Sequence, residues 1–146
     1  MEIDPSDIPL TSSEIRKRPL ALTWLCVLSF IGSGLSCTAY FFYAVSYNEI
    51  LSMIADGTLE YPGLELIMGA GQRFFVIGAI LAFFSWLGVS FMWRLKIVGI
   101  HIYTAAQLLM VALYSVTIKG YQYVLFDFLL AGIFILLYWR FRAVME

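Results

Sequence analysis

Four long stretches of apolar residues divide the chain, separated by short clusters of charged positions. Together they contain a single acidic residue, Asp127, and the chain's one histidine, His101. A helix needs about 20 apolar residues to cross the hydrocarbon core of a bilayer. We therefore predict an all-α, polytopic membrane protein, an up-down bundle of four transmembrane helices. Their expected ranges are about residues 19–47, 72–93, 97–118 and 121–140.

The composition leaves little material for a separate soluble domain. Of 146 residues, 62% are hydrophobic and 13% are charged. The ten acids and nine bases lie in different segments rather than mixed along one surface, which disfavours a nucleic-acid partner. We divide the chain into a polar tail, residues 1–18, and a transmembrane domain, residues 19–146, with an outer loop over residues 48–71.

The first apolar stretch is too long to be a cleaved signal peptide. It runs for 29 residues from Pro19 to Tyr47, whereas the apolar part of a signal peptide has about 7 to 15. As a helix it would be about 43 Å long, against a hydrocarbon core of about 30 Å. The helix must therefore tilt, kink or project beyond the membrane. Three tyrosines suit the end that leaves the membrane as an interfacial belt: Tyr40, Tyr43 and Tyr47.

Lys and Arg are unevenly distributed among the connections, and this predicts the orientation. The segments expected on one side carry seven of them, and the segments on the other side carry only Arg73 and Lys119. By the positive-inside rule, both termini are cytoplasmic and the outer loop faces away from the cytoplasm. We expect a bacterial inner membrane. The cytoplasmic ends carry residues typical of lipid anchors: Trp93, Arg94, Lys96, Trp139, Arg140 and Arg142.

The outer loop is predicted to contain a short interfacial helix. Asn48 can cap it, Glu49 suits its first turn, and Asp56-Gly57 supplies a stop. Residues from Leu64 onward could already lead into the second membrane helix. The loop is interpreted as a connector packed on the mouth of the bundle, with partner docking or ligand covering as the alternative.

Small residues recur on two of the predicted helices and indicate faces of close helix packing. On the first helix they are spaced four residues apart, and a similar pair lies on the second helix. Such faces allow backbones to approach within a membrane protein, or they can form a dimer contact. The residues are Ser29, Ser33, Cys37, Gly78 and Ala82.

The polar residues inside the predicted helices form a candidate intramembrane site. Asp127 would lie roughly 10 Å deep along its helix, where an ionised carboxylate is costly without a partner or water. Arg73 is predicted to reach it from the same side as a salt-bridge partner, and a proton- or cation-linked site or a contact to another subunit is the alternative. Gln107, near the middle of the third helix, is expected to hydrogen-bond across helices.

The sequence predicts no catalytic, metal or cofactor site. His101 alone cannot supply two axial haem ligands, and no His, Cys or carboxylate cluster has the spacing of metal ligands. Nor is there a nucleotide-binding glycine loop, a nucleophile beside a base, or a carboxylate pair for acid–base chemistry. We therefore expect a non-catalytic protein.

Two segments resemble a group of small four-helix inner-membrane proteins of Bacteroidota, which begin with a similar Arg/Lys-Pro and Phe-Ile-Gly-Ser-Gly segment and carry a Trp-x-Leu-Lys turn. The resemblance covers the first three helices and implies four helices in a bacterial inner membrane. It implies no catalytic residue. The matching residues are Arg18-Pro19, Leu22-Thr23, Leu25-Cys26, Leu28 to Gly34, Met92 to Lys96, Gly99, Tyr103 and Gln107.

Two classes of function follow from these features. In the first, the chain is an accessory or scaffold subunit whose helices pack against a larger membrane assembly. In the second, it is a small oligomeric transporter or channel-like protein with a polar path at Asp127 and Gln107. A lipid- or quinone-binding cleft is a further possibility. The expected partners are membrane lipids and either another protein or further copies of this chain.

Overall fold

The computed structural model describes residues 19–61, 63–118 and 124–145, and over these residues the prediction of an all-α protein is confirmed. The predicted polar tail, residues 1–18, lies outside the described residues. Six α-helices and a short 3-10 turn follow one another without a strand in the described part of the chain. They are α1 (Leu20–Val45), α2 (Tyr47–Ala55), α3 (Leu64–Met68), α4 (Gln72–Trp93), α5 (Val98–Thr117), α6 (Val124–Arg140) and η2 (Arg142–Val144).

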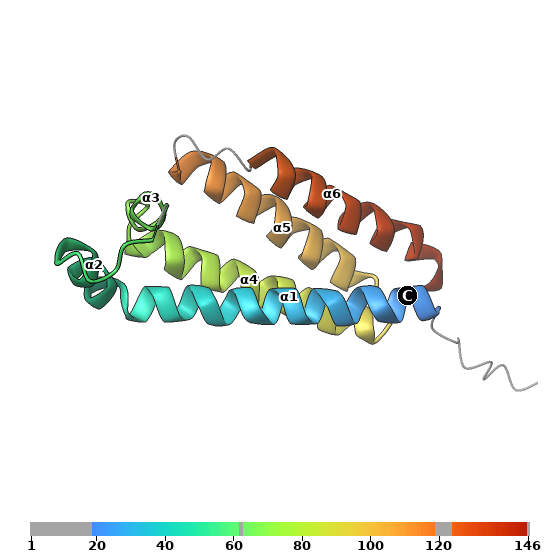
Figure 1. Ribbon diagram of the computed structural model, residues 1–146. Coiled ribbons are helices and arrows are strands. Elements are labelled where there is room, and N and C mark those ends of the chain that lie inside the picture. The colour runs from blue at the N-terminus through green and yellow to red at the C-terminus, as the bar shows by residue number, and fades with distance from the viewer. Residues whose placement is uncertain (1–18, 62, 119–123, 146) are drawn as a thin grey trace, which may run out of the picture.

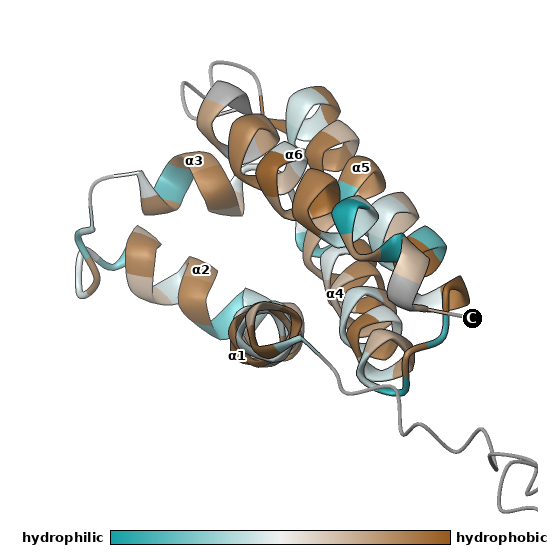
Figure 2. Ribbon diagram, turned by 90° about the vertical axis from the view of Figure 1, so that its right-hand side faces the viewer, coloured by the Kyte–Doolittle hydropathy of each residue, from teal (hydrophilic) through white to brown (hydrophobic). Residues whose placement is uncertain are grey.

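Three of these helices, α1, α4 and α5, are long and apolar enough to cross a membrane. In Figure 2 the turns of α4 and α5 alternate between brown and pale, the colours of apolar and of small or weakly polar residues. The helix α6 has 17 residues, about 26 Å by helical rise. Its passage through the membrane stays a prediction.

The predicted first helix, about residues 19–47, ends two residues earlier, at Val45, and Ser46 separates it from α2. The Ser46 N–H still bonds the Phe42 carbonyl and its own carbonyl accepts from Ile50, so the chain turns without losing backbone hydrogen bonds. In Figure 1, α2 leaves the end of α1 at a clear angle. The break lets Ile50 of α2 pack into the core beneath it. α1 by itself still has 26 residues, about 39 Å by helical rise, so it remains longer than a hydrocarbon core of about 30 Å and its tilt or projection stays a prediction.

The outer connection differs from its prediction in two details. The residue that precedes α2 is Ser46, so the proposed cap Asn48 lies exposed inside the helix, while Glu49 is in its first turn as expected. At the other end, Gly57 adopts a left-handed φ of 68° just after α2, which an L side chain would disfavour. The segment from Leu64 forms the separate helix α3, because Gly71, with a φ of 85°, breaks the chain before α4.

The long helices pack in a row rather than in a closed ring. α1 packs on α4, α4 on α5 and α5 on α6. Figure 1 shows α5 and α6 as an inclined pair that diverges from α1 toward the end where α2 and α3 lie. We call that end the loop end. The opposite end, where α1 begins and α6 stops, carries Arg94, Lys96, Arg140 and Arg142, and we call it the basic end.

A separate core cluster lies at each end of the bundle. At the basic end, Leu22 near the first described residue and Met145 near the last belong to the same cluster, so both described chain ends lie together. At the loop end, Phe74 and Phe75 pack with residues of α1, α2 and α5. Between these two clusters, side chains of α1, α4, α5 and α6 line a cleft.

Two glycines bring α4 and α5 into backbone contact near the basic end. A Cβ atom on Gly99 would lie 2.5 Å from the Gly88 carbonyl oxygen, and one on Gly88 would lie 2.8 Å from the Tyr103 nitrogen. Neither position has space for a side chain. The turn between these helices closes with hydrogen bonds from Leu95 to Met92 and from Lys96 to Phe91, the pattern of a Schellman motif.

Candidate functional site

Hydrogen-bonding side chains from four helices meet between the two core clusters. Tyr138 of α6 is fully buried, and its hydroxyl lies 2.7 Å from Ser29 Oγ and 3.1 Å from the Leu25 carbonyl oxygen, both on α1. These bonds hold α6 to α1 at the basic end, although the two helices are not neighbours in the row. Tyr138 thus joins the last helix of the row to the first at this end.

A second polar contact joins α5 to α4. Gln107 Nε2 of α5 donates to Ser85 Oγ of α4 over 3.1 Å, and the Tyr103 ring of α5 packs edge-on against the Tyr138 ring, with 5.2 Å between the ring centres. Ser85 is buried on α4. Gln107 and Ser85 are thus matched by each other, both neutral, as the low dielectric of a membrane interior favours. The expectation that Gln107 bonds across helices is confirmed by the contact with Ser85.

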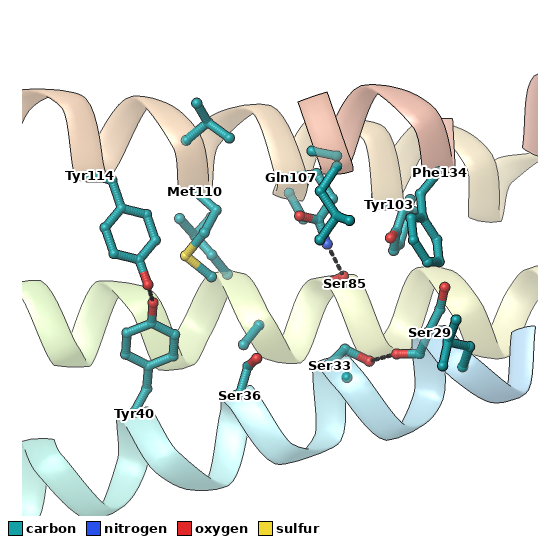
Figure 3. A pocket seen from close by; sticks show the side chains of 18 residues that line it. Ser29, Ser33, Ser36, Tyr40, Ser85, Tyr103, Gln107, Met110, Tyr114 and Phe134 are labelled. Atoms are coloured by element: carbon teal, nitrogen blue, oxygen red, sulfur yellow. Dashed lines mark hydrogen bonds between the residues drawn. The ribbon is translucent and has the colours of Figure 1, made fainter. Parts of the chain in front are cut away.

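A second tyrosine pair crosses the bundle nearer the loop end. The hydroxyls of Tyr40 on α1 and Tyr114 on α5 are hydrogen-bonded to each other, and Figure 3 shows the two side chains meeting tip to tip between their helices. Gly78 makes room for the Tyr40 ring, because a Cβ there would lie 2.8 Å from the ring carbons. Tyr40 was expected to be an interfacial anchor, but it points into the bundle instead.

Between these polar contacts lies a cleft of about 340 Å³, lined by α1, α4, α5 and α6. Its lining combines serine and tyrosine hydroxyls and the Gln107 amide with apolar side chains such as Leu81, Met110 and Phe134. Figure 3 shows these side chains converging from the facing helices. No charged side chain lines the cleft in the described part of the chain.

Of the predicted ion pair Asp127 and Arg73, the structure describes the side chain of Arg73 only. Arg73 is exposed in the first turn of α4 at the loop end. Asp127 belongs to the first half of α6 by its backbone, but its side chain lies outside the described residues. Their salt bridge therefore stays a prediction, and only Gln107 of the three candidate polar residues is placed in the cleft.

The residues predicted as a small-residue packing face lie on α1 and α4, which pack together. Ser29, Ser33 and Ala82 are buried and line the cleft. Further along, Cys37 Sγ approaches the Ala79 carbonyl oxygen at 3.8 Å, and Gly78 receives the Tyr40 ring. The small side chains thus serve two purposes: they bring α1 close to α4 and they leave the cleft open.

The predicted lipid anchors lie together at the basic end. Trp93 and Trp139 are partly exposed there, next to the exposed Arg94 and Lys96. The Arg142 guanidinium carbon lies 5.4 Å from the centre of the Trp139 ring, a cation–π distance. Arg140 and Arg142 are exposed beyond them.

Sequence reasoning missed Tyr138 and Ser85 as parts of the site. Tyr138 is followed by Trp139 and Arg140, and such a run is typical of interfacial anchoring. Its partner Ser29 lies 109 positions earlier, so no local pattern reveals the bond. A mid-helix serine such as Ser85 gives no signal of its own, because serines in membrane helices commonly bond their own backbone.

Comparison with models of known protein families, with curated proteins and with solved structures gives no match. Among the residues that the structure describes, no group of three or more His, Cys, Asp or Glu side chains could hold a metal ion. The cleft between α1, α4, α5 and α6 is the candidate functional site.

Proposed function

We propose that the chain is a non-catalytic integral membrane protein that serves as an accessory or scaffold subunit of a larger membrane assembly. The supporting observation is the way α1 is held. This 26-residue helix packs mainly on α4, and its contact with α6 depends on Tyr138 at one end. A helix supported on one face has its opposite face available to another protein.

The opposite face of α1 is a continuous apolar stripe. Its members recur at helical spacing and are exposed, whereas Leu22, Cys26, Ser29 and Ser33 on the other side are buried. Helices in membranes associate through side-chain packing and hydrogen bonds rather than through a hydrophobic driving force. The large, shaped side chains of the stripe suit such packing. They are Leu20, Trp24, Ile31, Leu35 and Phe42.

We also propose four spans, with both termini in the cytoplasm of a bacterial cell and the chain in its inner membrane. The clustering of bases at the basic end and of Glu49, Asp56, Glu60 and Glu65 in the opposite connection supports this orientation. So does the shared position of the two described chain ends. The resemblance to inner-membrane proteins of Bacteroidota agrees with this location.

The second candidate function is an oligomeric transporter. It is favoured by the place of Gln107 inside the cleft. A path through one chain would have to pass the bonded tyrosines Tyr40 and Tyr114, so this function would require several copies. Only a homo-oligomer in the native membrane would favour it over the accessory role.

Site-specific photocrosslinking in the native membrane tests the accessory role. A photoreactive phenylalanine analogue replaces Leu35 on the stripe of α1, and in a matched control it replaces Leu109, which is equally apolar and exposed on α5. We expect one heterologous protein to be captured from Leu35 and not from Leu109. Capture of lipid alone at both positions would contradict the accessory role.

Thiol labelling tests the orientation. In a variant without Cys26 and Cys37, single cysteines replace Thr58, between α2 and α3, and Lys96, between α4 and α5; both positions are exposed. A membrane-impermeant maleimide should label Thr58→Cys only from the periplasmic side and Lys96→Cys only from the cytoplasmic side. Labelling of both positions from one side would exclude the proposed topology.

A further inference from the structure

The described lining of the cleft suits an uncharged ligand. It offers hydroxyls, one amide and apolar walls, but no acidic or basic side chain. Inside a membrane, a charged group would find no counter-charge on this lining and would bear its full cost of desolvation. A neutral oxygen atom could be hydrogen-bonded at no such cost.

Two hydrogen-bond donors on opposite walls are available to such a ligand. Ser36 is an exposed residue of α1 that lines the cleft, and its hydroxyl has no hydrogen-bond partner among the described residues. Gln107 of α5 uses one amide N–H on Ser85, which leaves its second N–H to donate. Figure 3 shows Ser36 and Gln107 extending from facing helices. A ligand that bridges them needs two acceptor oxygens on different sides.

The size of the cleft fits a single ring. At roughly 30 Å³ per water-sized unit, 340 Å³ holds on the order of eleven such units. That is enough for one substituted six-membered ring and far too little for a helix, which is about 10 Å across with its side chains. The rings of Tyr103, Tyr114 and Phe134 and the Met110 thioether line the space, and they suit a planar, polarisable group.

The cleft opens sideways between α1 and α6. The Tyr40–Tyr114 pair crosses it toward the loop end, and Tyr138 joins α1 to α6 at the basic end. Along the remaining side, Leu28 and Gly32 of α1 and Leu130 of α6 line the cleft and are exposed. Because α1 is a membrane-spanning helix by length and composition, this mouth faces lipid tails, so the ligand enters from the bilayer.

We propose that the cleft binds the head group of a quinone-type lipid: a neutral ring with two carbonyl oxygens, whose apolar tail leaves between α1 and α6. Ser36 donates to one carbonyl and Gln107 to the other. This binding requires only the cleft and is independent of the proposed accessory role. The purified chain, without any partner, should therefore bind the ligand.

The test measures saturable binding of a radiolabelled benzoquinone with a ten-carbon chain to the full-length protein in lipid nanodiscs. Gly32→Leu narrows the mouth, and a Cβ at Gly32 meets no atom within 4 Å, so the fold should tolerate the change. Gly132→Leu is the matched control, because its Cβ is equally free and it does not line the cleft. We expect Gly32→Leu to weaken binding by at least about tenfold, or 1.4 kcal/mol, and Gly132→Leu to bind like the natural chain.

A second pair of variants tests the two donors. Ser36→Ala and Gln107→Leu should each weaken binding by about five- to tenfold, the range expected for loss of one hydrogen bond. The thermal unfolding temperature of each variant establishes that the protein is folded. Absence of saturable binding, or equal binding by Gly32→Leu, would overturn the proposal. Equal competition by dioctanoylglycerol, a neutral lipid without the ring, would overturn the assignment to quinones.

Discussion

At the scale of single residues, the hydroxyl of Tyr138 connects the last helix to the first. It is buried between Ser29 Oγ and the Leu25 carbonyl, and no water is available within a bilayer to replace these bonds. We predict that Tyr138→Phe lowers the free energy of unfolding by about 1–2 kcal/mol. Reversible unfolding in mixed detergent micelles, followed by circular dichroism, measures this loss.

The control for this prediction is Tyr43→Phe. The Tyr43 ring packs on Phe75 with 5.5 Å between ring centres, but its hydroxyl has no hydrogen-bond partner among the described residues. That variant should unfold within about 0.5 kcal/mol of the natural chain. Equal stability of both variants would show that the Tyr138 hydroxyl does not hold α6 to α1.

Asp127 and Arg73 remain a predicted ion pair, which a double-mutant cycle can detect. If the pair forms, Asp127→Asn and Arg73→Gln should each destabilise the protein by about 1–3 kcal/mol. The double variant should lose clearly less than the sum of both, because either change already breaks the pair. Strictly additive losses, or no loss from Asp127→Asn, would favour a separate role for the carboxyl group.

The residues of the cleft were only partly predictable from the sequence. Gln107 was recognised because an amide within an apolar helix requires a hydrogen-bond partner. Ser29 and Ser33 were recognised as small packing residues, but not as polar groups facing a cleft. Tyr138 was missed because its role depends on which helices meet in space, which hydropathy along the chain does not encode.

At the scale of helices, Gly88 and Gly99 set the contact between α4 and α5. Because a Cβ on Gly99 would lie within 2.6 Å of backbone atoms of α4, a methyl group there must push the helices apart. We predict that Gly99→Ala destabilises the protein by about 1–3 kcal/mol, despite the better helix propensity of alanine. Thermal unfolding of the protein in detergent measures the effect.

The matched control for this contact is Gly132→Ala on α6. No atom lies within 4 Å of a Cβ at Gly132, so the methyl group should fit and stability should hold or rise by up to about 1 kcal/mol. If Gly99→Ala were as stable as Gly132→Ala, close backbone packing would not determine how α4 and α5 meet.

Helix positions were more predictable than helix ends and breaks. The predicted range 72–93 coincides with α4, because runs of apolar residues longer than a span have few alternative structures in a membrane. The predicted end of the first helix, Tyr47, lies two residues beyond the observed end at Val45, because the apolar pattern continues through Ser46 to Tyr47. Burial of Ile50 in the loop-end core, a tertiary contact, decides where α1 ends and α2 begins.

At the scale of the whole molecule, the helices form an open row rather than the closed bundle that four antiparallel helices suggest. Each helix of the row contacts its neighbour, α1 with α4, α4 with α5 and α5 with α6, but α1 and α6 approach each other mainly through Tyr138. Sequence predicts which segments span the membrane, but it does not predict how fully they enclose one another. The open row leaves a cleft on one side of α1 and an unpaired apolar stripe on another.

The most direct test of the accessory role is the native mass of the protein after gentle extraction from its own membrane. The tagged chain is extracted with a mild detergent, and the intact complex is weighed by native mass spectrometry with identification of its components. We predict one copy of this chain bound to a different protein at fixed stoichiometry. A lone monomer, or a complex made only of copies of this chain, would contradict the accessory role.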